Sequence, residues 1–200
     1  MKQRPHTRLA PVTPVAADAA VDEALLVAAL GGGDLAALAT AFDRWHQRVR
    51  VLARRLLSDP AAAEDVVQDV FTALPRAVGR FRGEVDLETF LLGIAVKRVR
   101  RHRRAAQRRL RALERMRALD RRGPVDPEQD TYRRELGARL AAALDELPLP
   151  QRVAFVLCEV EELTSVQAAL VARAPEATIR TRLFHARRRL RDLLAGEQIR

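Results

Sequence analysis

The segment from Thr164 to Arg191 constrains the fold most, because it predicts two short helices joined by a tight turn. Thr164 and Gln167 stand at the spacing of a capping box, which satisfies free amide groups at the start of a helix. Pro175 suits the first turn of the second helix, and Glu176 complements the positive end of its dipole. The second helix is basic, and the whole segment therefore indicates a helix-turn-helix.

The predicted second helix separates an apolar side from a basic side. Apolar residues recur along it at three- and four-residue spacing, which predicts a core-facing stripe of Ile179, Leu183, Ala186, Leu190 and Leu193. Phe184 lies roughly 100° around the helix from Leu183, among arginines. Such an aromatic side chain is typical of a helix that enters the major groove and contacts thymine methyl groups. From this helix alone, a solvated basic helix whose phenylalanine packs on a neighbour is an equally weighted alternative.

Positive charge is concentrated in one segment of the chain. The net charge is +10, and residues 97–122 contain thirteen Lys or Arg and two acids. A run this basic either binds a polyanion or forms a solvated helix face, and nucleic acid is favoured because a second basic helix follows. Cys158 is the only cysteine, which excludes a disulfide framework and a cysteine-rich zinc site. No apolar run has transmembrane or signal-peptide character, so we expect a cytoplasmic protein.

The chain divides into four parts, and every predicted element is a helix. Residues 1–20 are rich in Pro and Ala and are expected to form a disordered tail. Residues 21–121 are predicted to be one helical domain, and residues 122–131 a linker with two prolines and a glycine. Residues 132–200 are predicted to be a second helical domain containing the helix-turn-helix, whose first helix has an apolar stripe of Val166, Ala169 and Leu170. The expected fold class is all-α, with two small helical domains joined by a linker.

The helix predicted after Asp59 and Pro60 is the second informative element. Asp59 can cap this helix, and Pro60 can occupy its first position. One face carries Val67, Val70, Phe71 and Leu74, and another carries Asp65, Gln68, Asp69 and Thr72. Such a helix is more often a core helix with a solvated side. In a chain that binds DNA, its acidic face is also a fair docking surface for a partner protein.

Together these segments resemble a known family, the extracytoplasmic-function (ECF) sigma factors of bacterial RNA polymerase. Residues 25–42 resemble the opening of sigma region two. Residues 61–71 resemble its most recognisable motif, which in the family docks on the clamp helices of the polymerase largest subunit. Residues 81–104 resemble the segment that opens and reads the −10 element. Residues 143–157 and 163–194 resemble region four, which reads the −35 element.

The chain departs from the family's pattern at several positions. Phe90 stands where the family usually has tryptophan, Leu92 where tyrosine is expected, and Lys97 where asparagine is common. Strand opening needs aromatic or polar groups to hold an unstacked base, which Phe81 and Phe90 can supply. Arg173 replaces the glycine usual in the helix-turn-helix turn, where a left-handed conformation would strain an arginine. A different turn, with the guanidinium on a phosphate, is the alternative.

The resemblance implies three sets of contact residues. The polymerase-binding set is Asp65, Gln68, Asp69 and Phe71. The DNA-binding set on the −10 side is Phe81, Phe90, Lys97, Arg98, Arg101 and Arg104. The DNA-binding set on the −35 side is Arg173, Thr178, Arg180, Thr181, Arg182, Phe184, His185 and Arg188. Within the last set, Arg180 and His185 are the expected donors to base edges.

The expected function is that of an alternative sigma factor, which binds core RNA polymerase and directs promoter recognition and transcription initiation. Its expected partners are core polymerase, promoter DNA and an anti-sigma factor, with no cofactor, metal or small-molecule substrate. The alternative is a helix-turn-helix transcriptional regulator that acts without polymerase docking and has no need of the acidic helix face. A structural RNA-binding protein would not need the helix-turn-helix. We do not expect an enzyme, because the four histidines are scattered and no nucleophile, acid and histidine form a constellation.

Overall fold

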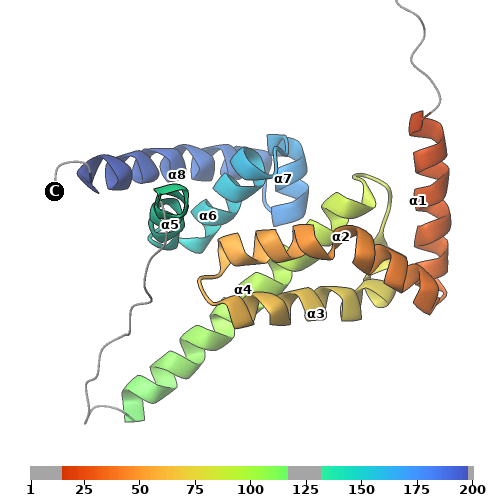
Figure 1. The fold of residues 1–200 in the computed structure, drawn as a ribbon, viewed down its shortest axis with the longest axis horizontal. Coiled ribbons are helices and arrows are strands. Elements are labelled where there is room, and N and C mark those ends of the chain that lie inside the picture. Colours follow the sequence, from red (N-terminus) through yellow and green to blue (C-terminus); the bar gives the residue numbers. More distant parts are fainter. Residues whose placement is uncertain (1–14, 117–131, 198–200) are drawn as a thin grey trace, which may run out of the picture.

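A computed structural model describes residues 15–116 and 132–197, and every regular element in these ranges is a helix (Figure 1). The first range contains α1 (Val15–Gly31), α2 (Leu35–Leu56), α3 (Pro60–Ala77), the 3-10 turn η1 (Val78–Arg80) and α4 (Leu87–Met116). The second contains α5 (Tyr132–Asp145), α6 (Leu149–Phe155), the π-helical turn η2 (Val156–Val160), α7 (Ser165–Ala172) and α8 (Glu176–Glu197). The all-α prediction is confirmed.

Two predicted segments fall partly or wholly outside the described residues. Helix α1 begins at Val15, inside the segment predicted as a tail, while residues 1–14 lie outside the description. The predicted linker, residues 122–131, also lies outside it. The basic run predicted from residue 97 is helical as far as Met116, where α4 ends.

Three helices begin at a residue whose short polar side chain caps the free backbone N–H groups of the first turn. Asp34 and Asp59 cap α2 and α3, each accepting a hydrogen bond at Oδ1 from the backbone N–H two residues later, at 2.7 and 2.9 Å. Thr164 and Gln167 form the capping box of α7, with both reciprocal hydrogen bonds present. The caps predicted at Asp59 and Thr164 are therefore confirmed. Gly33 has φ +79°, a left-handed conformation that turns the chain between α1 and α2.

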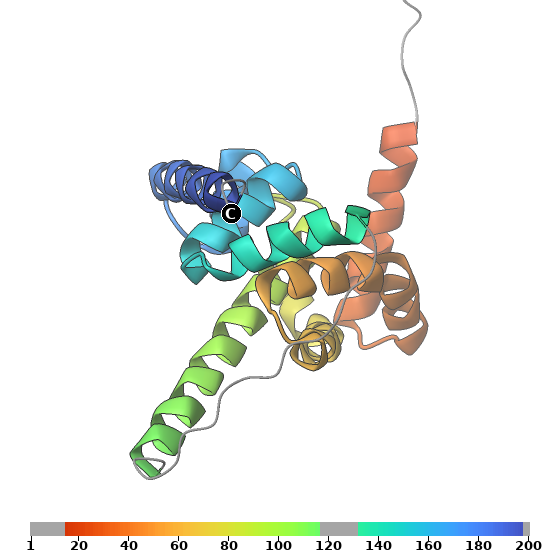
Figure 2. The ribbon, with the colours of Figure 1, turned by 60° about the vertical axis from the view of Figure 1, so that its left-hand side comes forward.

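The first four helices pack around a core to which α2, α3 and the first half of α4 all contribute. Helices α2 and α3 lie side by side and α4 crosses them (Figures 1 and 2). Trp45 and Val49 of α2, Val70 of α3 and Leu91 of α4 are buried in this core. Burying one such side chain contributes about 1.5–3 kcal/mol relative to leaving it exposed. The second half of α4 extends away from α2 and α3 (Figure 2), and Arg101 and Arg104 there are exposed, whereas Arg100 is half-buried.

Helix α8 packs along α6 and α5 through the side predicted from its apolar spacing. Ile179, Ala186 and Leu190 are buried, and Leu183 and Leu193 are half-buried. Ala186 and Leu190 share a small cluster with three residues at the end of α5 and just after it, namely Ala143, Leu144 and Leu147. The predicted register of α8 is confirmed.

Helix α7 buries a different side from the apolar stripe seen in the sequence. Of the predicted stripe, Val166 is 55% exposed and Leu170 is 44% exposed, and only Ala169 is half-buried against the core. The fully buried residues are instead Ala168, Val171 and Ala172. The reason is the partner: α7 packs against α4 as well as α8, and it does so through small residues. A Cβ added at Gly93 of α4 would lie 3.8 Å from the Val171 Cα, so the two backbones approach closely.

One continuous hydrophobic core joins the two halves of the chain. The cluster that contains α2, α3 and α4 also includes Val153, Leu157, Val171 and Ile179 from the second half. The two predicted domains are thus both present as helical units and packed against each other. Among the described residues, no helix is long and apolar enough to span a bilayer.

Candidate nucleic-acid interface

The acidic face of α3 points to solvent, as its helical spacing predicted. Asp65, Gln68 and Asp69 are exposed. Asp69 lies 3.7 Å from Arg98 of α4, as an ion pair between Oδ2 and Nη1. Phe71, from the same predicted set, is only 5% exposed and meets the ring of Phe42 edge-on at 5.0 Å. Phe71 therefore supports the face from inside the core.

The two phenylalanines predicted for strand handling lie together. Their ring centroids are 5.2 Å apart with the planes inclined at 69°, an edge-to-face contact between Phe81 and Phe90. Both side chains are half-buried. They line a cavity of about 610 Å³ between α3, α4 and α7. Phe81 is held there because η1 ends at Arg80 and the Phe81 N–H donates to the Val78 carbonyl at 2.9 Å.

The cations predicted on the −10 side follow α4 outwards from this cavity. Lys97 is exposed and Arg98 is half-buried, and both line the cavity. Arg101 and Arg104 are exposed farther along α4, beyond the cavity. The predicted set thus divides into two cations in the cavity and two on the projecting part of the helix. Arginines that project from a helix suit contacts to phosphates.

Arg100, which the sequence analysis did not identify, contacts the end of α7. Its guanidinium Nη1 donates to the Ala172 carbonyl at the end of α7, at 2.7 Å. Burial lowers the Arg100 pKa from its ordinary value, and the nearby charges of Arg182 and Arg104 lower it further. This arginine therefore satisfies one of the free carbonyls at a helix C-terminus and joins the two halves of the chain.

The helix-turn-helix turn contains the strain that its sequence suggested. Arg173 has φ 49° and ψ 56°, a left-handed conformation for a residue that has a Cβ. The alternative of a different turn is therefore wrong. The Arg173 N–H donates to the Leu170 carbonyl at 3.2 Å, and the Ala174 N–H donates to the Ala169 carbonyl at 3.0 Å. These hydrogen bonds close α7 in the manner of a left-handed helix cap.

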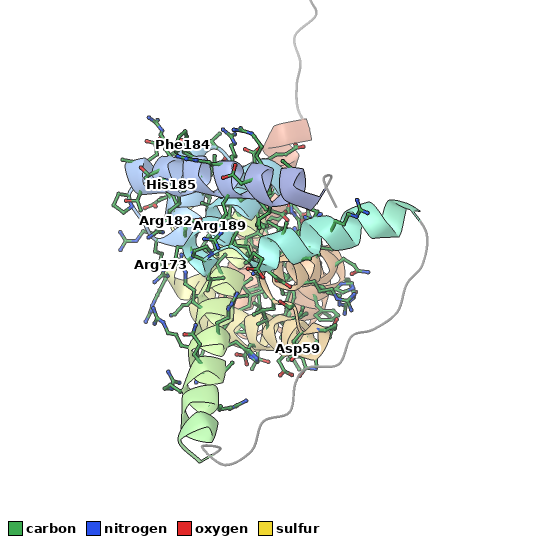
Figure 3. The ribbon with its side chains drawn as sticks, turned by 90° about the vertical axis from the view of Figure 1, so that its left-hand side faces the viewer. Asp59, Arg173, Arg182, Phe184, His185 and Arg189 are labelled. Atoms are coloured by element: carbon green, nitrogen blue, oxygen red, sulfur yellow. The ribbon has the colours of Figure 1, made fainter. Side chains whose placement is uncertain are left out.

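Helix α8 exposes the aromatic side chain predicted to read bases. Phe184 is 62% exposed and meets the ring of its exposed neighbour His185 edge-on at 5.5 Å. Figure 3 shows Phe184 above the α8 ribbon and Arg182 below it, on the side of Arg173, with His185 between them. Arg188 is also exposed, and Arg182 and Thr178 are half-buried. The predicted reading face is accordingly open to solvent.

Two of the predicted readers at the start of α8 already have hydrogen-bond partners. Arg180 pairs with Glu176 one turn earlier, and Glu176 also accepts from the Ser165 hydroxyl. The hydrogen bonds from Ser165 and Arg180, in that order, lower the pKa of Glu176. Thr181 donates its hydroxyl to the Ala177 carbonyl at 2.9 Å, which leaves its methyl group for apolar contact.

The sequence did not predict a group of ion pairs centred on Glu161 and Arg48, two of which join the two halves of the chain. Glu161, only 5% exposed, accepts from Arg48 and from Arg55 of α2, each at 3.1 Å. Arg48 also pairs with Glu88 of α4. Arg48 loses solvation through burial, yet Glu88 and Glu161 raise its pKa overall. No sequence pattern predicts the two pairs with Glu161, because each joins residues more than a hundred positions apart in the chain.

Arg152 of α6 is the one fully buried cation among the described residues. It pairs with Asp145 at the end of α5, and its Nη1 lies 3.4 Å from the Leu56 carbonyl of α2. Burial lowers the Arg152 pKa, and the Asp145 carboxylate opposes that shift. Its Nε and Nη2 have no hydrogen-bond partner among the described residues.

The described residues contain no group of three or more His, Cys, Asp and Glu side chains arranged to hold a metal ion. The sites outlined above are therefore surfaces with exposed cations, aromatic rings and an acidic face. Chemically, such surfaces bind polyanions and protein partners through charge and stacking.

Two family models match the chain, one in each half. The model described as Sigma-70 region 2 matches residues 41–109, from α2 through most of α4. The model described as Sigma-70, region 4 matches residues 137–190, from α5 into α8.

Curated relatives and solved structures agree with these models. The RNA polymerase sigma-H factor of Pseudomonas aeruginosa is 30% identical over 170 residues, covering 81% of this chain and 88% of the relative. The ECF RNA polymerase sigma factor SigE of Mycolicibacterium smegmatis is 34% identical over 74% of this chain and 58% of its own length. CnrH, solved in complex with the cytosolic domain of CnrY, has a similar fold, with a TM-score of 0.63 and 22% identity over 87% of this chain and 97% of that one.

Proposed function

This chain belongs to the sigma-70 family, among the ECF RNA polymerase sigma factors, and from that premise we propose how its surfaces share the work. As a sigma factor it binds core RNA polymerase and directs promoter recognition and transcription initiation. The acidic face of α3 docks on the polymerase, the aromatic pair with the cations of α4 handles the opened strand, and α8 reads duplex DNA upstream. The observation that carries this division is the separate exposure of these three surfaces.

The polymerase contact is assigned to Asp65, Gln68 and Asp69. All three are exposed on α3 in the motif that resembles the family's clamp-binding segment. Phe71 contributes by fixing the helix against Phe42, since its own side chain is buried. A surface of carboxylates steers association with a basic partner and adds specificity more than raw affinity.

The strand contact is assigned to Phe81 and Phe90 with Lys97, Arg98, Arg101 and Arg104. An unstacked base gains from stacking on an aromatic side chain, at about 1–3 kcal/mol per base. The arginines on the projecting part of α4 supply phosphate contacts, which position the strand without reading it. Leu92, found where a tyrosine was expected, is fully buried and takes no part in this contact.

The duplex contact is assigned to the exposed side of α8. Phe184 and His185 present an aromatic edge and an imidazole to the groove, and Arg188 lies on the same helix. Arg182, Thr178 and Arg173 border this side and serve phosphates. Arg180 reaches a base only by leaving Glu176, so base reading there competes with an existing ion pair.

Regulation by an anti-sigma factor is part of the proposal. Similarity to CnrH, which was solved with the cytosolic domain of CnrY, supports it, as does similarity to the sigma factor RpoE solved with the anti-sigma factor NepR from Bartonella quintana. The protein acts by binding and not by catalysis, and it needs no cofactor. It works in the cytoplasm, where core polymerase and promoter DNA are.

The assignment of the acidic face is tested by Asp65→Arg. We expect the variant to keep its thermal stability, since a surface change usually alters it by about 0.5 kcal/mol or less. Pull-down of core polymerase should fall at least tenfold, and run-off transcripts should fall with it. Asp43→Arg, on the exposed side of α2, is the matched charge control. Equal pull-down by the Asp65→Arg and wild-type proteins would favour a regulator that binds DNA without polymerase.

A further inference from the structure

The cavity beside Phe81 and Phe90 has walls from both halves of the chain. Its volume of about 610 Å³ lies within the range of small-molecule sites, about 300–1,000 Å³. Helix α3, the loop before α4 and α4 itself form one wall. Leu170, Val171 and Arg173 form the other, because α7 lies against α4 (Figure 1). A ligand held here would contact region two and region four together.

The lining of the cavity is strongly cationic. Its six cations are Arg76, Arg80, Arg82, Lys97, Arg98 and Arg173, against two acids, Asp69 and Glu84. Within the described residues, only Arg98 of these six forms an ion pair, with Asp69 at 3.7 Å. Unpaired cations around one cavity attract an anion and lower the cost of desolvating it.

One buried nitrogen in this lining lacks a partner. The Nε of Arg98 is inaccessible to solvent and has no hydrogen-bond acceptor among the described residues. A buried donor left unpaired is costly, and such a donor in a native structure calls for an explanation. The Arg98 side chain is 23% exposed, so an anion in the cavity meets its accessible part and not the enclosed Nε.

The aromatic pair adds a second kind of recognition. Phe81 and Phe90 are only half-buried, so part of each ring remains available beside the cations. A planar heterocycle stacks on such a ring, and phosphates pair with arginines. A free phosphate uses the cations and not the rings, whereas a nucleoside uses the rings and not the cations. A nucleoside phosphate uses both.

Arg173 links this cavity to the strained turn. Its left-handed backbone would suit glycine better, so the chain keeps an arginine here against a conformational cost. Its side chain supplies the only cation on the α7 side of the cavity among the lining residues. The strained conformation is explained if the positive charge of Arg173 is needed, with the cations of the other wall, to bind an anion in the cavity.

We propose that this cavity binds a nucleoside phosphate, with the base against Phe81 and Phe90 and the phosphates between Arg98 and Arg173. The bound ligand holds α7 against α4. It therefore favours the arrangement in which region four covers the aromatic pair, and it competes with an opened strand for the same rings. Phe81 and Phe90 also belong to the proposed strand contact, but nucleotide binding is measured with neither polymerase nor promoter, so the two proposals fail separately.

The test uses the full chain and isothermal titration calorimetry with ATP, adenosine and inorganic triphosphate. We expect ATP to bind at least tenfold more tightly than either fragment of it. Arg173→Gly should weaken ATP binding at least tenfold while the melting temperature without ligand stays equal or rises, because glycine relieves the turn. Phe90→Leu, which keeps an apolar side chain, should weaken ATP binding at least fivefold and leave triphosphate binding unchanged.

Arg109→Ala is the matched control, because it removes one positive charge from an exposed position of α4 outside the cavity. It should bind ATP as the wild type does. Absence of ATP binding overturns the proposal. So does equal binding by the Arg173→Gly protein, which would place the ligand on region two alone. Binding of a single-stranded oligonucleotide without any binding of ATP would assign the cavity to the promoter strand only.

Discussion

The arginines between the two halves and the arginines on the outer faces of α4 and α8 do different work. Between the halves, Arg48 and Arg55 pair with Glu161, while the buried Arg152 pairs with the exposed carboxylate of Asp145. On the outer faces, Arg101 and Arg104 project from α4 with no ion-pair partner among the described residues. Identical side chains thus stabilise the fold in one region and remain available to phosphate in the other. The difference is whether a carboxylate faces the guanidinium, as the buried Glu161 and the exposed Asp145 do, and not the local sequence.

The largest expected effect concerns the ion pair between the buried Arg152 and the exposed Asp145. Asp145→Ala should lower the free energy of unfolding by about 3 kcal/mol, because removing one partner leaves the buried charge of Arg152 uncompensated. Urea denaturation of the full chain measures it. The double variant Asp145→Ala/Arg152→Met should recover most of the loss, since it removes the charge together with its partner. A double variant less stable than Asp145→Ala alone would contradict this account.

A smaller loss of stability is expected where α2 packs against the second half of the chain. Glu161→Gln should destabilise the chain by about 1.5 kcal/mol, because two charge-assisted hydrogen bonds from Arg48 and Arg55 are weakened at a largely buried carboxylate. Glu159→Gln is the matched control, because Glu159 pairs with Arg187 at an exposed site. Losing an exposed ion pair lowers the free energy of unfolding by about 0.5 kcal/mol or less. Thermal melts of both variants at low and high salt make the comparison. Equal losses at the two sites would remove the distinction between the regions.

For the exposed arginines of α4, we expect an effect on DNA binding and none on stability. Arg101→Ala/Arg104→Ala should leave the melting temperature unchanged, since both side chains are exposed. The same variant should weaken DNA binding at all promoters alike. Its plot of log affinity against log salt should lose roughly one unit of slope for each phosphate contact removed. A loss confined to one promoter sequence would show that these residues read bases.

The smallest effect is a change in acid sensitivity at the start of α8. Hydrogen bonds from Ser165 and Arg180 lower the pKa of Glu176 in the folded chain. A carboxyl whose pKa is lowered by folding stabilises the fold above its unfolded pKa, and this contribution is lost as the pH falls through the folded pKa. Glu176→Gln should therefore lower the melting temperature near pH 7, where the ionised carboxylate contributes in full, and flatten its decline below the ordinary pKa of 4.5. If the melting temperature of the variant fell below pH 4.5 as steeply as that of the wild type, the lowered pKa of Glu176 would be contradicted.

Much of the helical structure could be read from neighbours in the chain. The caps at Asp59 and Thr164 and the register of α8 each depend on residues a few positions apart, and the structure confirms them. The exposure of Phe184 follows from the same register. The candidate contact residues were found by resemblance to a family, and their individual roles stay predictions.

The errors and omissions have a common cause. The predicted apolar stripe of α7 comprised Val166, Ala169 and Leu170, of which only Ala169 packs on the core. The buried side is set by α4, which lies far away in the sequence. Local periodicity reports how apolar a face is and not which neighbour covers it. The cavity cations Arg76, Arg80 and Arg82 were not singled out, because nothing in their spacing shows that α7 closes the space beside them.

The sequence by itself determined the helices, their caps, the separation into two helical units and the concentration of positive charge, because these depend on short-range spacing and composition. Only the tertiary structure decided which arginines are paired, which face of α7 is buried, and that Arg173 adopts a strained left-handed turn beside an aromatic cavity. Several of those outcomes depend on contacts between segments far apart in the chain, such as Arg100 with the Ala172 carbonyl. The energy of such a contact comes from burial and charge that exist only after the helices have packed.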